Sequence, residues 1–257
     1  MRFIRLKRSD GVTSWGRLHD EVVDLLDRAP WEKDPQTTGN VPFDQKMILA
    51  PATPSKIAAL AANYEGATGR SDEDEEPIVF LKPGTAVIGT NDEILCPFKG
   101  VNVWGESELA IVVGRTLTKA NLDQARAAIF GYTLANDVTA DNISGRDHHL
   151  ARSKGADTFC PIGPWIETDF IPDRQLIRGW HNNVLLRESG LNQRVMKEVE
   201  TLAWLSQWLT LFPGDIILTG APTRVRDRIF FKDGDTFTCR VEGLGELKNC
   251  FRQFDRL

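Results

Sequence analysis

The chain has 257 residues, a formal net charge of −5 and a pI near 5.5. The acidic balance argues against nucleic acid as a partner, because binding to a phosphate backbone requires a basic surface. No apolar run is long enough to span a bilayer, and the first ten residues lack the apolar core and cleavage site of a signal peptide. The four cysteines (Cys96, Cys160, Cys239 and Cys250) show no zinc or redox spacing, so we expect reduced thiols in a cytoplasmic protein.

Two units are predicted along the chain. Residues 1–50 are expected to form a small N-terminal β-rich appendage and linker. Apolar and basic residues alternate over the first ten positions, and strand-like sequence follows from Val12 to Leu26. The segment from Ala29 to Phe43 is rich in Pro, Gly and polar residues, which is typical of a linker. Residues 51–257 are predicted to form the main domain.

Short strands dominate the main domain in this prediction. They are expected at residues 56–62, 77–81, 86–88, 101–114, 130–138 and 216–219, followed by a run of short strands to the C-terminus. Helices are expected at 118–129, with Thr118 as N-cap, and at 194–211, where apolar residues recur at helical spacing. The balance favours an α+β, β-rich fold of mixed sheets with few helices.

Residues 65–76 combine glycines with an acidic run. Such a segment is typical of a solvated surface loop. The functional alternative is a lid over a site, since lids are drawn from segments of low local stability.

A pair of carboxylates inside an apolar run is the most informative pattern of the chain. Glu106 and Glu108 stand two residues apart on a predicted strand, so their side chains share a face. Like charges this close repel one another and lose solvation beside apolar neighbours, and a hard cation is the simplest compensation. Asp137 follows in another strand-like run. Three carboxylates on strands suit Mg²⁺ or Mn²⁺, although most Glu-x-Glu pairs are a solvated strand face.

The order of motifs from residue 56 to residue 250 resembles that of the fumarylacetoacetate hydrolase family. The motifs are Asn63-Tyr64, Phe80-Leu81-Lys82-Pro83, Gly105–Gly114, Gly131-Tyr132-Thr133, Asn136-Asp137-Val138, Arg152-Ser153-Lys154, Asp157-Thr158-Phe159, Pro161–Trp165, Pro213–Pro222 and Gly243-Leu244-Gly245. The resemblance implies a mixed β-roll that often forms dimers, so a homodimer is the expected assembly. It also implies a small-molecule 2-oxo or β-diketo (di)carboxylate substrate that is cleaved, decarboxylated or isomerised with Mg²⁺ or Mn²⁺.

The resemblance assigns roles to single residues. Glu106, Glu108 and Asp137 match the metal-binding carboxylates, and Lys154 matches the lysine beside metal and substrate. Thr219 and Gly220 match the loop that anchors a substrate carboxylate, and Lys82 is a further substrate-binding candidate. A 2-oxo acid chelated by the metal would lose a C–C or C–H bond through an enolate, which the metal and Lys154 would stabilise.

The chain departs from the family pattern at positions that matter for chemistry. Family hydrolases carry a His and a Glu that activate water where this chain has Ala67 and Arg70, and neither replacement is a general base at neutral pH. Substrate-holding Arg and Gln residues of many members are Asp141 and Ser144 here. These departures therefore favour decarboxylation or isomerisation over C–C hydrolysis.

Two further groups of side chains have open roles. His148, with His149 beside it, lies between Asp137 and Lys154 in the sequence and is the candidate general base; the alternative is a pair of exposed loop histidines. Arg224, Arg226 and Arg228 alternate after the Thr219 loop, where they would attract an anionic substrate or form a solvated edge strand or subunit contact.

The sequence is compatible with two hypotheses about function. One is a metal-dependent enzyme that acts on 2-oxo acids. The other is a non-catalytic or partner-dependent member of the same fold, which keeps the metal site and lacks the water-activating pair.

Overall fold

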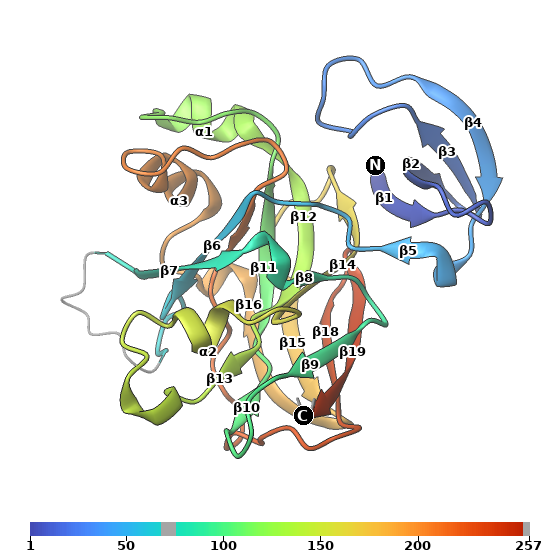
Figure 1. The fold of residues 1–257 in the computed structure, drawn as a ribbon. Helices are drawn as coiled ribbons and strands as arrows, with labels where there is room; N and C mark the ends of the chain where they lie inside the picture. Colours follow the sequence, from blue (N-terminus) through green and yellow to red (C-terminus); the bar gives the residue numbers. More distant parts are fainter. Residues whose placement is uncertain (68–75, 254–257) are drawn as a thin grey trace.

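The computed structural model describes residues 1–67 and 76–253, and Figure 1 shows a β-rich molecule with short helices at its edges. The α-helices of this part are α1 (Leu122–Ala128), α2 (Ala151–Gly155) and α3 (Glu198–Leu205), and the 3-10 helices are η1 (Gln45–Met47), η2 (Gly84–Ala86), η3 (Ile143–Gly145) and η4 (Leu191–Gln193). The strands are β1 (Arg2–Lys7), β2 (Thr13–His19), β3 (Val22–Leu26), β4 (Thr37–Pro42), β5 (Ile48–Leu49), β6 (Lys56–Ala61), β7 (Ile78–Pro83), β8 (Val87–Ile88), β9 (Glu93–Cys96), β10 (Val103–Trp104), β11 (Ser107–Val113), β12 (Ile129–Asn136), β13 (Thr139–Ala140), β14 (Cys160–Glu167), β15 (Leu176–His181), β16 (Val184–Gly190), β17 (Ile216–Leu218), β18 (Thr236–Val241) and β19 (Gly245–Gln253). The predicted β-rich mixed fold with few helices is confirmed.

One large mixed sheet runs through both predicted units in the order β4-β3-β2-β1-β14-β12-β11-β17-β6-β7, with β5 on β1 and β8 on β14. The N-terminal strands are therefore an outward extension of the main sheet, joined to it where β1 pairs with β14 (Figure 1). The expected linker at 29–43 is partly wrong, because Thr37–Pro42 forms β4 and pairs with β3.

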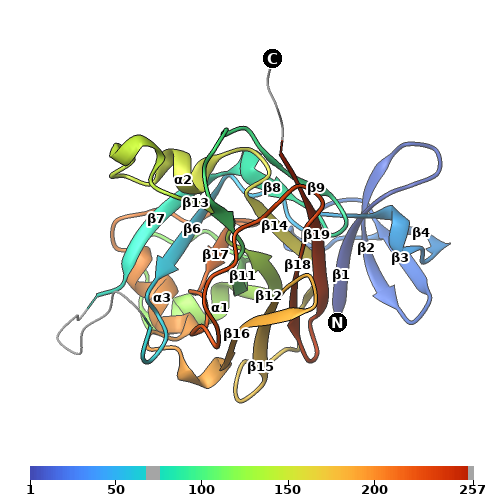
Figure 2. The same cartoon turned by 90° about the horizontal axis from the view of Figure 1, so that it is seen from below.

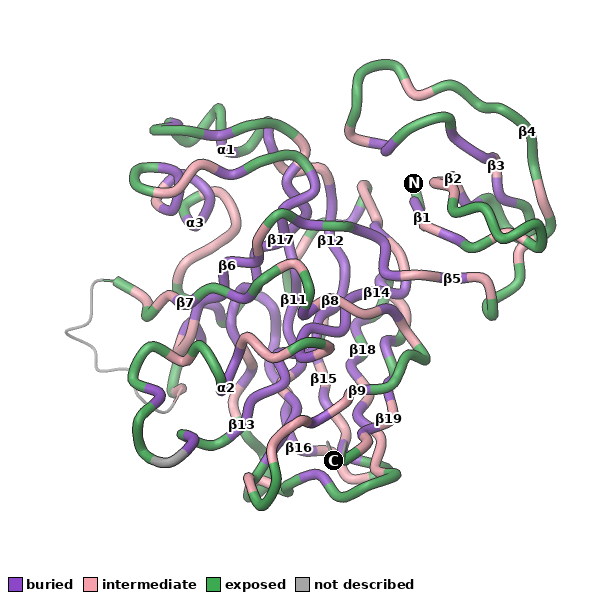
Figure 3. The backbone as a smooth tube through the Cα atoms, in the orientation of Figure 1, coloured by how far each residue is buried: buried purple, intermediate pink, exposed green. Residues whose placement is uncertain are grey.

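A second sheet, in the order β16-β15-β18-β19-β9, packs against the large one. Strands β11, β12 and β14 contact β15, β18 and β19 across the interface, and Figure 2 shows these strands together in the middle of the molecule. The largest apolar cluster fills the space between the sheets and continues under α1 and α3. Figure 3 shows the central strands as mainly buried, whereas the loops near α2 and much of the N-terminal strands are exposed.

Strand β11 is buried over its whole length. Leu109, Ile111 and Val113 join the cluster between the sheets, whereas Ala110 and Val112 join the cluster on the opposite face. This alternation follows from the two-residue period of a strand. Glu108 shares the face of Ala110 and Val112, at the end of β11 where the cavity described below opens.

Both predicted helices are shorter than expected. Asn121, not Thr118, is the N-cap of α1: its side chain accepts from the Gln124 amide at 2.9 Å, and the Gln124 side chain accepts from the Asn121 amide at 2.9 Å. Lys119, with a φ of 49°, also prevents a helix from starting at 118. The second helix starts only at Glu198, because Arg194 makes an extended bridge to Tyr64.

No helix in the described residues has the length and apolar character needed to cross a membrane. The four cysteines carry free thiols. Most of the proposed lid, including Arg70, lies outside the described residues.

Candidate active site

The register of two central strands brings two of the predicted metal ligands together. Ser107 of β11 pairs with Asn136 of β12, so Glu106 and Asp137 lie opposite one another just beyond the pair. The Asp137 amide donates to the Glu106 carbonyl at 2.8 Å, and the Glu106 amide donates to the Asn136 side chain at 2.9 Å. The chain segments that carry the two carboxylates are therefore fixed by hydrogen bonds from both backbone amides.

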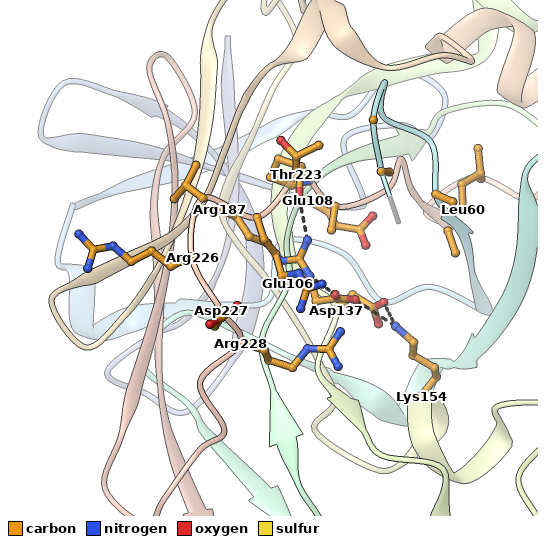
Figure 4. Close-up of a pocket in the computed structure, with 18 of the residues that line it drawn as sticks. Leu60, Glu106, Glu108, Asp137, Lys154, Arg187, Thr223, Arg226, Asp227 and Arg228 are labelled. Atoms are coloured by element: carbon orange, nitrogen blue, oxygen red, sulfur yellow. Dashed lines mark hydrogen bonds and ion pairs between the residues drawn. The ribbon is translucent and has the colours of Figure 1, made fainter. Parts of the chain in front are cut away.

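These carboxylates face a cavity of about 720 Å³. Figure 4 shows Glu106, Glu108, Asp137 and Lys154 directed toward one another there. The described residues that line the cavity are Leu60, Ala61, Ala62, Gly66, Ala67, Phe80, Glu106, Glu108, Asp137, Lys154, Arg187 and the segment 221–228. Acidic and basic side chains meet in this cavity, which is the arrangement expected of a site for a small charged ligand.

Lys154 reaches the carboxylates from α2. The Asp147 carboxylate accepts the Arg152 and Ser153 amides at 3.1 and 2.5 Å and so fixes the start of this short helix. Lys154 Nζ forms an ion pair with Asp137, lies 3.3 Å from Glu106 Oε2 and donates to Thr139 Oγ1 at 2.7 Å. Burial alone would lower the pKa of Lys154, but Asp137 and Glu106 outweigh it and raise the pKa. The amine therefore stays protonated.

Arg187 is a site residue that the sequence did not suggest. It lies on β16, is buried, pairs with Glu106 and donates to the Pro222 carbonyl at 2.6 Å. Burial opposes ionisation of Glu106, but Lys154 and Arg187 together lower its pKa to about 2. In the sequence, Arg187 follows Leu185-Leu186 and resembles an ordinary polar residue on the outer face of a strand. No local pattern therefore indicates that it belongs to the site.

Glu108 has the opposite electrostatic environment. Its Oε2 accepts the Gly220 amide at 2.6 Å, and it forms no ion pair with a described residue. Burial raises its pKa well above 4.5, and the charges of Asp137 and Glu106 raise it further. A buried carboxylate with this pKa lacks a compensating positive charge.

A hard divalent cation fits this donor set in chemical terms. Three carboxylates supply oxygen ligands, and a cation beside Glu108 would supply the missing charge. As the side chains stand, no three acidic, histidine or cysteine residues of the described chain are gathered closely enough to hold a metal ion. The Lys154 ammonium lies between Glu106 and Asp137, so metal binding would require it to draw back.

Lys82 lies behind the site and not at its surface. Its side chain is completely buried; Nζ lies 2.7 Å from Asp137 Oδ1 and donates to the Val138, Lys154 and Phe159 carbonyls at 3.1, 2.8 and 2.7 Å. We predicted that it binds substrate, but these contacts leave it no access to the cavity. They instead fix Asp137 and the segment that carries Lys154.

The loop after β17 reaches the site through its backbone. The Thr219 hydroxyl donates to the Leu109 carbonyl at 2.9 Å, and the Thr219 carbonyl accepts the Asn63 side chain at 2.9 Å. Gly220 has a φ of +96°, and a Cβ there would lie 2.9 Å from Asn63 Cβ. Thr219 and Gly220 therefore hold Glu108 and the cavity wall, and the substrate contact we predicted for them stays a prediction.

The structure does not bring His148 to the cavity. Both His148 and His149 are exposed in the loop before α2, and neither lines the cavity. The role of His148 as general base stays a prediction without a supporting contact. Ala67, by contrast, does line the cavity, at the position where the resemblance places a water-activating His. The arginines at 224, 226 and 228 line it on an irregular segment, not on the edge strand that we considered.

The fold and the site define a class of carboxylate-rich, β-roll proteins, and comparison with known proteins identifies the family. Residues 56–252 match the family model described as fumarylacetoacetate (FAA) hydrolase C-terminal, and residues 1–51 match the one described as Rv2993c-like, N-terminal. This chain belongs to the fumarylacetoacetate hydrolase family.

Two curated relatives are Protein Rv2993c of Mycobacterium tuberculosis and a bovine protein named oxaloacetate tautomerase FAHD2B, mitochondrial. The first is 38% identical and the match covers 97% of both chains; the second is 35% identical, with 81% of this chain and 70% of the relative covered. The relatives thus include a protein named for isomerising a 2-oxo acid.

Two solved structures share the whole fold. A 5-carboxymethyl-2-hydroxymuconate delta-isomerase from Mycobacterium smegmatis is 35% identical with a TM-score of 0.88, and a maleylpyruvate hydrolase from Sphingobium sp. SYK-6 is 26% identical with a TM-score of 0.78. Both matches cover 99% of this chain and 100% of the other chain. The hydrolase was solved with manganese(II) and pyruvate. Homologues of this chain are therefore isomerases, tautomerases and hydrolases of oxo acids, and one was crystallised with Mn²⁺.

Proposed function

We propose that this protein is a divalent-metal-dependent isomerase or tautomerase of a 2-oxo dicarboxylate. The observation that carries the proposal is the composition of the cavity. Three carboxylates and Lys154 meet there, and Ala67 lines the wall where the family's hydrolases place a histidine. None of the described residues that line the cavity is a histidine. The site therefore has groups that stabilise an enolate and lacks the usual group that activates water.

We assign the metal to Glu106, Glu108 and Asp137. When bound there, Mg²⁺ or Mn²⁺ would supply Lewis-acid stabilisation of negative charge on the 2-oxo oxygen. The raised pKa of Glu108 supports this assignment, because a buried carboxylate without a cation disfavours ionisation. The manganese in the maleylpyruvate hydrolase structure supports it from the family side.

Lys154, Arg187 and Lys82 are cationic side chains with separate roles at this site. Lys154 places a protonated amine at the carboxylates, next to the position where the enolate oxygen would carry charge. Arg187 holds Glu106 ionised and fixes its orientation, and Lys82 contacts Asp137 from behind and fixes its position. Phe80 lies 4.6 Å from Lys154 Nζ, measured to its ring centroid, and shields the amine from solvent.

A substrate panel tests the proposal. Oxaloacetate, an acylpyruvate and an unsaturated 2-oxo dicarboxylate are each followed by enol absorbance and product analysis, with Mg²⁺, with Mn²⁺ and with excess chelator. We expect metal-dependent interconversion of enol and keto forms or double-bond isomers, without new cleavage products. Release of pyruvate or CO₂ at a comparable rate would reassign the reaction to hydrolysis or decarboxylation.

The non-catalytic reading predicts a different result from the same panel. A member that only binds would take up the metal and leave every compound at its metal-only rate. Activity that appears only after a second subunit is added would favour the partner-dependent form. The expected homodimer stays a prediction, which light scattering of the purified protein would test.

A further inference from the structure

The segment that follows the Thr219 loop forms one wall of the cavity and carries three arginines. Residues 221–228 line the cavity without regular secondary structure, apart from an isolated bridge between Arg224 and Arg187. Among the described residues, Arg224, Arg226 and Arg228 have no ion-pair partner within the site. Unpaired guanidinium groups on the wall of a cavity indicate an anion that is bound there.

Arg228 is the best placed of the three. Its guanidinium lies over the Trp104 indole, with 3.7 Å from Cζ to the ring centroid. Trp104 is buried and stands two residues before Glu106, so the stack is fixed to the chain segment that carries the metal site. Figure 4 shows the Arg228 side chain directed toward Asp137 and Lys154, whereas Arg226 points the opposite way. Stacking orients the planar group and leaves its N–H edge available.

One donor of Arg228 is buried without an acceptor in the described part of the chain. Its Nε is buried and has no hydrogen-bond partner among the described residues. Arg187, on the neighbouring wall, is instead occupied by Glu106 and the Pro222 carbonyl. A buried donor without an acceptor is unfavourable in a folded protein, and an anion bound in the cavity would supply the acceptor.

Acidic and basic groups both surround the Arg228 guanidinium. Burial lowers the pKa of Arg228; Glu106 and Asp141 oppose that effect, and Arg224 and Arg187 add to it. The guanidinium nevertheless remains charged, because arginine does not deprotonate in proteins. Asp141 occupies the position where the resemblance places a substrate-holding arginine. Arg228, from another part of the chain, lies close enough to Asp141 to sense its charge.

We propose that Arg228, oriented by Trp104 and supported by the charge of Arg224, binds the substrate carboxylate remote from the 2-oxo group. The assignment rests on the proposed function, since the near carboxylate belongs with the metal. It makes Arg228 a residue that determines specificity for 2-oxo dicarboxylates over 2-oxo monocarboxylates.

Matched ligands test this assignment through binding affinity instead of reaction rate. Calorimetry of the Mg²⁺-loaded protein gives the dissociation constants of oxaloacetate and of 2-oxobutanoate, which have the same chain length and differ in the remote carboxylate. We expect the wild-type protein to prefer oxaloacetate by about ten- to a hundredfold, the range of a charge-assisted bidentate pair. Arg228→Gln removes this preference, and Arg228→Lys, which keeps the charge without the fork, retains part of it.

Arg240→Gln is the control, because it removes the same charge from an exposed position on β18 that does not line the cavity. It keeps the preference of the wild-type protein. Oxalate, which has no remote carboxylate, binds all four proteins with equal affinity and so reports that each is folded. An unchanged preference in Arg228→Gln, equal losses in Arg228→Gln and Arg240→Gln, or no preference in the wild-type protein overturns the proposal. A preference without any turnover leaves this subsite in place and removes the proposed reaction instead.

Discussion

Glu108 differs from the other carboxylates of the cavity because no cationic side chain pairs with it. Burial, Asp137 and Glu106 raise its pKa well above 4.5. A carboxyl group whose pKa is raised in the folded state favours folding while it is protonated, and this contribution is lost as pH rises through the folded-state pKa. The metal-free protein therefore carries a destabilising charge at Glu108 at high pH.

Glu108→Gln should consequently stabilise the metal-free protein at pH 8 and have little effect near pH 3, where the carboxyl is protonated in both states. Added Mg²⁺ should raise the melting temperature of the wild-type protein and not that of the variant. Thermal unfolding at both pH values, with and without Mg²⁺, provides the measurement. Glu246→Gln, an exposed change on β19, is the control. Equal Mg²⁺ stabilisation of both proteins would contradict the assignment of Glu108 as a ligand.

Lys82 provides a second prediction at the scale of single residues. Removal of one partner from a buried ion pair costs about 3–5 kcal/mol of stability, because the other charge stays buried. Lys82→Met leaves Asp137 without this partner and three carbonyls without their donor. We expect a loss of that size in urea unfolding at pH 7. The exposed Lys248→Met should change stability by less than about 0.5 kcal/mol, and similar results for both variants would show that Lys82 is not a positioning residue.

The sequence indicated which carboxylates and which lysine lie together in the cavity, but not which cationic side chains support them. Strand alternation placed Glu106 and Glu108 on one face, and the motif order linked them to Asp137 and Lys154. Arg187 was missed because its contact with Glu106 spans 81 positions of the chain. Lys82 was misplaced because no sequence pattern separates a lysine that binds substrate from one that supports a carboxylate from behind.

The turn after β17 joins two parts of the site and requires a glycine. The loop after β17 turns at Gly220, where φ is +96° and a Cβ would approach Asn63 Cβ to 2.9 Å. The same residue donates its amide to Glu108. The geometry of this turn therefore affects the position of Glu108, the proposed metal ligand.

Gly220→Ala should therefore weaken Mg²⁺ binding as well as lower stability. A positive φ in a residue with a side chain costs about 1–3 kcal/mol, and the contact with Asn63 adds to this. Gly100→Ala is a control for the backbone alone, because Gly100 has a φ of +68° and open space around its Cβ position. Metal titration and urea unfolding of both variants separate the two effects. A Gly220→Ala protein that binds Mg²⁺ like Gly100→Ala would contradict the coupling.

Helix ends show why element boundaries were harder to predict than element types. The predictions of helices at 118–129 and 194–211 were correct in type, but tertiary pairing and local capping decided their lengths. Arg194 is held by Tyr64 in an extended bridge, and Asn121 forms a capping box that replaces Thr118. Periodicity does not report such distant or competing partners.

At the scale of the whole molecule, the N-terminal strands and the main domain share one sheet. Trp31 connects them: its ring packs against Phe130 and Trp15, with centroid distances of 5.7 and 4.9 Å, and covers the Gly214 turn. The sequence predicted a small β-rich unit here but not its continuity with the main sheet. Strand pairing between positions 2–3 and 166–167 leaves no local trace in the sequence.

Trp31→Ala should therefore lower the stability of the whole molecule by about 2 kcal/mol, because a large, partly buried ring is lost. Unfolding followed by Trp fluorescence and by circular dichroism should remain a single coincident transition. Trp208→Ala, at a side chain that is 56% exposed, should change little. Two separate transitions in the wild-type protein would contradict the shared sheet as a cooperative unit.

The central claim is that the cavity forms a metal-stabilised enolate of a 2-oxo acid. The most direct test is the exchange of the C3 hydrogens of oxaloacetate and 2-oxoglutarate with deuterium, followed by proton NMR in the presence of diamagnetic Mg²⁺. We predict exchange by the wild-type protein well above the Mg²⁺-only rate, its loss in excess chelator, and a reduction of about 100-fold or more in Lys154→Met. Exchange of both compounds at the Mg²⁺-only rate, in a protein that binds Mg²⁺, would contradict the account.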